Sequence, residues 1–284
     1  MTDSNTPRPG PWDAKPGQAA KAAPRVASPG NPRGVRPSQD RGQHPLWALA
    51  STLMLGGLIW YLTGSWIAVV AVLFGLLVHE YGHVLAMNAY GMGPARIYVV
   101  PFVGGMARGR RRAESEWHGV LVSLAGPAFG LLAAIPFFGL YIILGQGMWL
   151  QGVFYIAMLN LLNLAPAPPL DGSKALGPVL ALIHPMLERV AMVLVGAIVV
   201  LWGLSNGSYV FAAFLAFALY GHLKRGHWRP EGRRLTRMEA GRSVGLFALT
   251  AAACVAVALA GLMPIAGSFE QALVFGGDYF EFGR

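Results

Sequence analysis

The stretch Ser65–Tyr90 reads SWIAVVAVLFGLLVHEYGHVLAMNAY, and the rest of the chain is best interpreted outward from it. As a helix it is long enough to span the roughly 30 Å of membrane hydrocarbon, for which about 20 apolar residues suffice. It nevertheless contains three ionisable residues, His79, Glu80 and His83. Such groups are costly in lipid and need a partner or a water-filled cavity, so they mark a candidate functional site.

The spacing of these three residues is that of a zinc site. His79 and His83 are four residues apart, so both imidazoles lie on one face of a helix, while Glu80 is turned about 100° away. In the pattern His-Glu-x-x-His, the two histidines bind zinc and the glutamate is the general base. A single histidine in an apolar helix is more often a hydrogen-bonded core residue. Two histidines and a glutamate within one turn have no such simple explanation.

The composition of the whole chain indicates a membrane protein. Of its 284 residues, 55% are apolar and only 12% are charged, whereas soluble domains have about 25% charged residues. The sequence predicts an all-α polytopic protein of about seven transmembrane helices, over 46–63, 66–90, 117–145, 149–165, 187–204, 209–223 and 243–262. We expect residues 1–44 to be a disordered cytoplasmic tail, 45–263 the transmembrane domain with a catalytic core at about 66–175, and 264–284 a short extracytoplasmic tail.

The basic residues indicate the orientation in the membrane. With seven spans, bases exceed acids by 4, 3, 0 and 5 in the segments of one side, which are residues 1–45, 91–116, 171–189 and 224–242. The turns of the other side carry no charge, and the tail from residue 263 has a net charge of −2. By the positive-inside rule the N-terminus is cytoplasmic and the C-terminus extracytoplasmic. The formal charge of +9 is therefore a topology signal, and we expect no nucleic-acid partner.

Asp171 is the candidate for the third zinc ligand. The segment from Asn163 to Gly172 contains three prolines, which cannot continue a helix. Irregular backbone at membrane depth is tolerated only where it lines a cavity or packs inside the protein, so this segment is expected to border the site. Without the two histidines, Asp171-Gly172 would instead be interpreted as a turn at a membrane exit.

Two motifs together resemble the site-2 protease family of intramembrane zinc metalloproteases, peptidase family M50. They are His79-Glu80-Tyr81-Gly82-His83, and Asn163-x-x-Pro166 followed by Pro169-Leu170-Asp171-Gly172. The resemblance covers about residues 66–175. It implies a Zn2+ ion held by His79, His83 and Asp171, with Glu80 as the catalytic acid and base. It also implies that Asn163 binds substrate or stabilises the oxyanion, although an interhelical hydrogen bond or a helix-terminal cap is an equal alternative for Asn163.

Two further segments resemble parts of this family. Residues 97–103 followed by Gly104-Gly105 predict a re-entrant hairpin, with the glycines at its turn. One edge of it pairs with an unwound substrate by strand addition, or it is only a lid. Ala125-Gly126-Pro127 also matches, but many relatives have Asn where this chain has Gly130. The spacing of Gly126 and Gly130 is interpreted as close helix packing.

The sequence therefore predicts an integral membrane protein of a bacterial cell membrane that cleaves single-span membrane-protein substrates in the lipid bilayer. The first alternative is a non-catalytic zinc-containing protein that binds membrane partners. Intact Glu80 and Asp171 argue against this alternative, because neither the base nor the last ligand is lost. A metal-ion transporter is the weakest alternative, since it would need ionisable groups in several spans. The one cysteine, Cys254, excludes an intramolecular disulfide.

Overall fold

The computed structural model describes residues 42–101, 104–205, 207, 209–225, 232–268, 270–272 and 274. The chain divides into two compact units, Met1–Asp40 and Arg41–Arg284, and the description below is of the second unit. The disordered tail expected at residues 1–44 thus falls outside the described residues except for 42–44.

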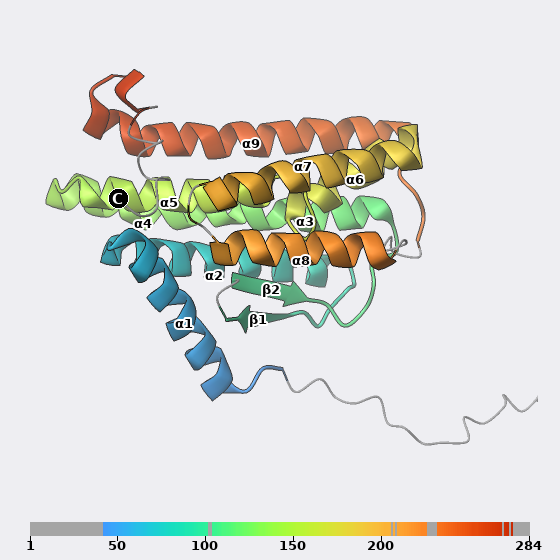
Figure 1. Cartoon of the computed structure of the whole chain (residues 1–284), viewed down its shortest axis with the longest axis horizontal. Coiled ribbons are helices and arrows are strands. Elements are labelled where there is room, and N and C mark those ends of the chain that lie inside the picture. The colour runs from blue at the N-terminus through green and yellow to red at the C-terminus, as the bar shows by residue number, and fades with distance from the viewer. Residues whose placement is uncertain are drawn as a thin grey trace, which may run out of the picture. The chain divides into compact units, whose positions relative to one another are not determined.

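The described residues of the second unit are mostly helical (Figure 1). The helices are α1 (Pro45–Thr63), α2 (Trp66–Ala89), α3 (Glu116–Gly130), the short 3₁₀ helix η1 (Leu131–Ala133), α4 (Ala134–Leu144), α5 (Met148–Asn163), α6 (Asp171–Ile183), α7 (Pro185–Ser205), α8 (Tyr209–Arg225) and α9 (Arg237–Ala266). Two strands, β1 (Arg96–Val100) and β2 (Gly104–Arg108), follow α2. In Figure 1, α2, α5 and α9 run alongside one another, whereas α1 is inclined to them.

Among the residues that the structure describes, five segments are long and apolar enough to cross a membrane: α1, α2, the continuous run Glu116–Leu144, α7 and α9. The prediction of a helical membrane protein is therefore confirmed. The count of seven spans is not confirmed, because α5 and the apolar part of α8, Ala212–Gly221, are shorter than a full span. Whether these two helices also cross the bilayer stays a prediction.

The helix that carries the His-Glu-x-x-His motif begins at a well-formed cap. Gly64 adopts φ 60°, a left-handed conformation that favours glycine, and ends α1. The Ser65 side chain then accepts a hydrogen bond from Ala68 N at 3.4 Å and so caps α2. This tight connection leaves 13 residues, or about 20 Å of helix, between the start of α2 and His79.

The core lies around α5. Five hydrophobic residues of this helix are almost fully buried: Leu150, Val153, Phe154, Ile156 and Ala157. They pack against α2 and α4 on one side and against α9 on the other. Polar groups are scarce in this core, so a polar side chain that is buried there needs a specific partner.

The strands form an antiparallel hairpin in which Arg96 pairs with Arg108 and Val100 with Gly104. The hairpin after the second helix is thus observed, but the position of its turn was predicted wrongly. Gly104 and Gly105 begin β2 and pair with Val100 and Val99 of β1, so they do not form the turn. The re-entrant placement of the hairpin in a membrane stays a prediction.

The structure also contains a helix that the sequence analysis treated as a loop. Residues Asp171–Ile183 form α6, and Asp171 is its first residue. At 13 residues this helix is too short to meet a spanning criterion, and the prolines before it suggested that the chain left the membrane there. It packs instead against α3, α7 and α9.

Loops that the charge pattern assigns to one side of the membrane do lie together. The two basic loops are joined by hydrogen bonds from Glu116 N to Arg233 O at 2.9 Å and from Arg233 N to Glu114 O at 3.1 Å. At the opposite end of α2, Trp66 packs edge to face against Trp149 of α5, with ring centroids 5.8 Å apart. The grouping of the loops is consistent with the predicted topology, and the compartment that each end faces stays a prediction.

Candidate metal centre

Two helices bring the three predicted metal ligands together. His79 and His83, one turn apart on α2, direct their Nε2 atoms to the same point, 3.1 Å from each other. The Oδ2 atom of Asp171, at the start of α6, lies 3.1 Å from both nitrogens. All three side chains are buried. The three atoms form a nearly equilateral triangle that a single ion can bind.

The proline-containing segment places Asp171 at this position. Helix α5 ends at Asn163 and α6 begins at Asp171, so the intervening residues form a tight non-helical connection. Gly172 is required there, because a Cβ atom at this position would overlap the main-chain carbonyl of Leu164. The Asp171 carboxylate also lies at the N-terminus of a helix, where the helix dipole favours a negative charge.

The donor set fits zinc. Zinc binds histidine nitrogen and carboxylate oxygen at about 2.0–2.2 Å, so ligand atoms at the corners of a tetrahedron lie about 3.3–3.5 Å apart. The 3.1 Å separations observed between the three atoms are close to this range. Two nitrogens and one carboxylate oxygen, which leave a fourth position for water, are typical of a catalytic zinc site.

Hydrogen bonds to the far side of each imidazole set which nitrogen faces the metal. His83 Nδ1 lies 2.8 Å from the carbonyl oxygen of Val122, and His79 Nδ1 lies 2.9 Å from the side-chain oxygen of Asn160. Both partners only accept hydrogen bonds, so both Nδ1 atoms carry the proton. The Nε2 lone pairs consequently face each other and the carboxylate, and a cation is what stabilises such an arrangement.

Glu80 is positioned to act as a base beside the ligands. Its side chain is buried, and within the described part of the chain its Oε2 atom has no hydrogen-bond partner. The carboxylate interacts electrostatically with the His79, His83 and Asp171 side chains. Strand β2 covers this carboxylate, since a Cβ atom on Gly105 would come within 3.0 Å of Glu80 Oε1. A buried carboxylate oxygen without a partner is rare in proteins, and here it is available to bind a reacting water.

Gly126 on α3 closes the other side of the site. A Cβ atom at Gly126 would overlap the His83 ring and lie 2.9 Å from His79 Nε2. The sequence analysis interpreted this glycine as a helix-packing residue without a chemical role. Close packing is what the structure shows, but the surface against which Gly126 packs is the pair of metal-binding imidazoles.

Asn163 is the last residue of α5 and is half-buried. Its side-chain nitrogen donates to Leu159 O at 2.9 Å, four residues earlier in the same helix. This bond lies within α5, so it is not the interhelical hydrogen bond that was one alternative for Asn163. Its role in substrate binding or oxyanion stabilisation stays a prediction.

Two residues at the site were missed by the sequence analysis. Asn160 contacts His79 as described, and Lys174 places its Nζ atom 3.6 Å from Asp171 Oδ1, the carboxylate oxygen that faces away from the histidines. Asn160 had a signal in the sequence, because an amide in an apolar helix needs a partner. Lys174 had none, since it was assigned to a loop.

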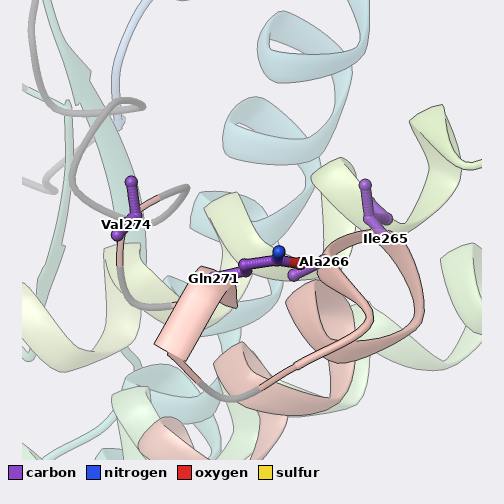
Figure 2. A pocket seen from close by; sticks show the side chains of 4 residues that line it. All are labelled: Ile265, Ala266, Gln271 and Val274. Carbon is purple, nitrogen blue, oxygen red and sulfur yellow. The ribbon is translucent and has the colours of Figure 1, made fainter.

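A separate surface hollow lies near the end of α9, and its lining residues are not suited to metal binding or acid–base catalysis. Figure 2 shows its lining side chains, Ile265, Ala266, Gln271 and Val274. None of them is a metal ligand or a titratable group. The neighbouring Gly261 packs on Leu150 of α5, ten residues or about 15 Å along that helix from Asn160. The hollow is therefore separate from the metal centre.

Comparison with known proteins agrees with this site. The model of Peptidase family M50 matches residues 67–156, which include the His-Glu-x-x-His motif but not Asp171. A Synechocystis sp. (strain ATCC 27184 / PCC 6803 / Kazusa) protein named "Putative zinc metalloprotease sll0528" is 32% identical over 129 residues. The match covers 43% of this chain and 32% of that protein, so the chain spans about a third of the relative's length. No solved structure matches the chain.

These comparisons confirm the resemblance to the site-2 protease family. Together with the His79, His83 and Asp171 group they also support Zn2+ as the metal. The family model ends before Asp171, so the third member of the ligand triangle comes from the geometry and not from that match.

Proposed function

We propose that this protein is an intramembrane zinc metalloprotease, which hydrolyses peptide bonds within or near the transmembrane segment of membrane-protein substrates. One observation carries the proposal: three ligand atoms converge at 3.1 Å from one another, beside a buried carboxylate oxygen without a partner, at one helix that can cross a membrane. A structural zinc site has four protein ligands and needs no base. Within the described ranges of the chain, this site has three ligands and Glu80.

Each residue of the site has a role in hydrolysis. His79, His83 and Asp171 would hold the zinc, which when bound supplies a Lewis acid for the scissile carbonyl and for an attacking water. Glu80 accepts the proton of that water and then delivers it to the nitrogen of the leaving amine. Val122 O and the Asn160 side chain keep the two imidazoles oriented throughout.

The proposed substrates are single-span membrane proteins. The family resemblance implies membrane-tethered transcription factors, anti-sigma factors or remnant signal peptides. With the N-terminus in the cytoplasm of a bacterium, His79 lies about 20 Å from the outer end of α2, on the cytoplasmic side of the bilayer centre. Cleavage near the cytoplasmic end of the substrate span and release of a cytosolic fragment follow from this orientation.

The hairpin next to Glu80 is proposed to guide or to shield the substrate. The outer edge of β1 is already occupied at Val99, because the Gln43 side chain accepts from Val99 N at 2.7 Å and donates to Val99 O at 2.8 Å. A substrate strand that adds at this position of β1 would have to displace Gln43. The lid alternative needs no such displacement.

The test of the function is the Glu80→Gln variant in proteoliposomes with a panel of single-span substrates. Cleavage is expected to fall by about 10²–10⁴-fold or more because the base is lost. Zinc content is expected to stay at the wild-type level, because Glu80 is not a ligand. Gel shift measures the extent of cleavage, mass spectrometry identifies the cleaved bond, and elemental analysis gives the zinc content.

Glu114→Gln is the matched control, since it removes an exposed carboxylate that is not part of the metal centre and is expected to keep full cleavage. Full turnover by Glu80→Gln would reject Glu80 as the base. Zinc in the wild type, together with capture but no cleavage of every substrate, would favour the alternative of a zinc-containing binding protein.

A further inference from the structure

Asn160 is an amide buried completely inside the bundle. Its Nδ2 atom donates to Ile156 O at 2.8 Å, and its Oδ1 atom lies 2.9 Å from His79 Nδ1. The carbonyl of Ile156 can only accept, so it fixes which end of the amide is the nitrogen. The oxygen must then face His79. The orientation of Asn160 therefore determines the tautomer of a metal ligand.

The amide occupies a space that only glycine leaves open on the neighbouring helix. A Cβ atom on Gly130 of α3 would overlap Asn160 Oδ1 and would lie 2.7 Å from Asn160 Cγ and 2.8 Å from Nδ2. Contacts this short are not tolerated between packed atoms, and the amide has no room to move since it is fully buried. Gly130 and Asn160 thus form a matched pair across α3 and α5.

The two metal-binding histidines differ in how they are held. His83 donates to the main-chain oxygen of Val122, a group that no side-chain substitution removes. His79 is held by a side chain that costs free energy to bury in an apolar helix bundle unless its hydrogen bonds are made. A leucine of similar size would pack at position 160 without this cost, so the amide is explained by its bond to His79.

We propose that Asn160, in the space left by Gly130, is a positioning residue that holds His79 in the Nδ1–H tautomer and so sets the affinity of the site for zinc. This inference rests on the zinc site of the proposed function, but not on proteolysis. Partners of this kind contribute about 10–100-fold to metal affinity.

The experiment is zinc binding by the full-length protein in detergent, in competition with a chelator of known affinity. Asn160→Leu is expected to bind zinc about 10–100-fold more weakly. Asn160→Asp, which keeps an acceptor for His79, is expected to recover most of that loss. The absorption bands of Co2+ bound in place of zinc are expected to shift in Asn160→Leu and to return towards the wild-type spectrum in Asn160→Asp.

Ser243→Ala is the matched control. Ser243 is also completely buried and donates between helices, to Ala175 O at 2.8 Å, but it does not contact a metal ligand through this bond. It is expected to bind zinc like the wild type. Weaker zinc binding in Ser243→Ala, equal to that in Asn160→Leu, would mean that any lost interhelical bond weakens the site, and would overturn the proposal.

Gly130 provides a second test that does not depend on Asn160→Leu folding. Gly130→Ala alone is expected to weaken zinc binding, because the added methyl group displaces the amide. In an Asn160→Ala background the same change is expected to add no further loss, since the space is then empty. Strictly additive effects of the two substitutions would overturn the pairing.

The outcomes separate this inference from the proposed function. A wild-type protein that binds no zinc would reject the metal site itself. A wild type that binds zinc and cleaves, with Asn160→Leu equal to it in zinc affinity and Co2+ spectrum, would reject only the positioning role of Asn160.

Discussion

Gly126 matters to the metal centre as much as a ligand does, because α3 passes directly over the imidazoles at this residue. A side chain of any size would occupy the position of the His83 ring edge. The absence of a Cβ atom is thus part of the site, although glycine is an unfavourable residue inside a helix.

We predict that Gly126→Ala weakens zinc binding at least tenfold, since the added methyl group must push His79 and His83 apart. Overpacking of this kind also costs about 1–3 kcal/mol of stability. Chelator competition and thermal unfolding in detergent measure the two effects. Gly119→Ala is the control on the same helix, because nothing lies within 4 Å of a Cβ at Gly119. Equal zinc affinity in the two variants would contradict the prediction.

At this scale the sequence predicted the residues that bind the ion but not the residues that orient them. Histidines at i and i+4 with a neighbouring glutamate are recognisable from local spacing alone. The contacts of Asn160 with His79, and of Gly130 with Asn160, join residues 30 to 81 positions apart. Such contacts depend on how helices are packed, and a single sequence contains no periodicity that reports them.

The elements that shape the site are the short ones. Long apolar helices follow from hydropathy and were predicted within a few residues, whereas α6 was missed and the hairpin turn was misplaced. Hydropathy identifies an element only when its apolar run is long. A 13-residue helix and a five-residue strand are too short for a clear hydropathy signal. Both elements are stabilised by tertiary contacts, α6 by three neighbouring helices and β1 by the side chain of Gln43.

We predict that Gln43→Ala loosens the hairpin without changing zinc affinity. The two hydrogen bonds to Val99 are lost, at about 0.5–1.5 kcal/mol each, and the Val99 amide is left exposed at the strand edge. Hydrogen–deuterium exchange of a peptide that covers β1 and β2 is expected to become faster. Gln151→Ala on α5 is the control and is expected to leave this peptide unchanged. Unaltered exchange of the Val99 amide in Gln43→Ala would show that Gln43 does not secure the hairpin.

For the whole molecule, the charge pattern and the contacts describe the same arrangement. The basic loops after α2 and before α9 are hydrogen bonded to each other at one end, and the aromatic pair of Trp66 and Trp149 lies at the other. The positive-inside rule adds the compartment, which contacts alone do not report. The charge pattern and the contacts thus both support the prediction of which loops lie on the same side of the membrane.

Cysteine labelling in intact cells tests the orientation. Arg110→Cys and Arg234→Cys are expected to be protected from a membrane-impermeant maleimide, and Gln146→Cys to be labelled. All three positions are exposed, and the native Cys254 is fully buried and is replaced by alanine in the background. Labelling of both arginine positions in intact cells would mean that the orientation is opposite to the predicted one. Labelling of only one of them would mean that the two basic loops do not lie on the same side of the membrane.

The shortness of α5 has a consequence for the supply of reactant. Its 16 residues extend about 24 Å, whereas the hydrocarbon layer is about 30 Å thick. After its last turn, the chain continues as the non-helical backbone of residues 164–170. Hydrolysis consumes one water molecule for each bond cut, and lipid holds almost none. Non-helical backbone at membrane depth is found where it lines a water-filled cavity or packs inside protein. Under the proposed function, we therefore expect the early end of this core helix to admit that water.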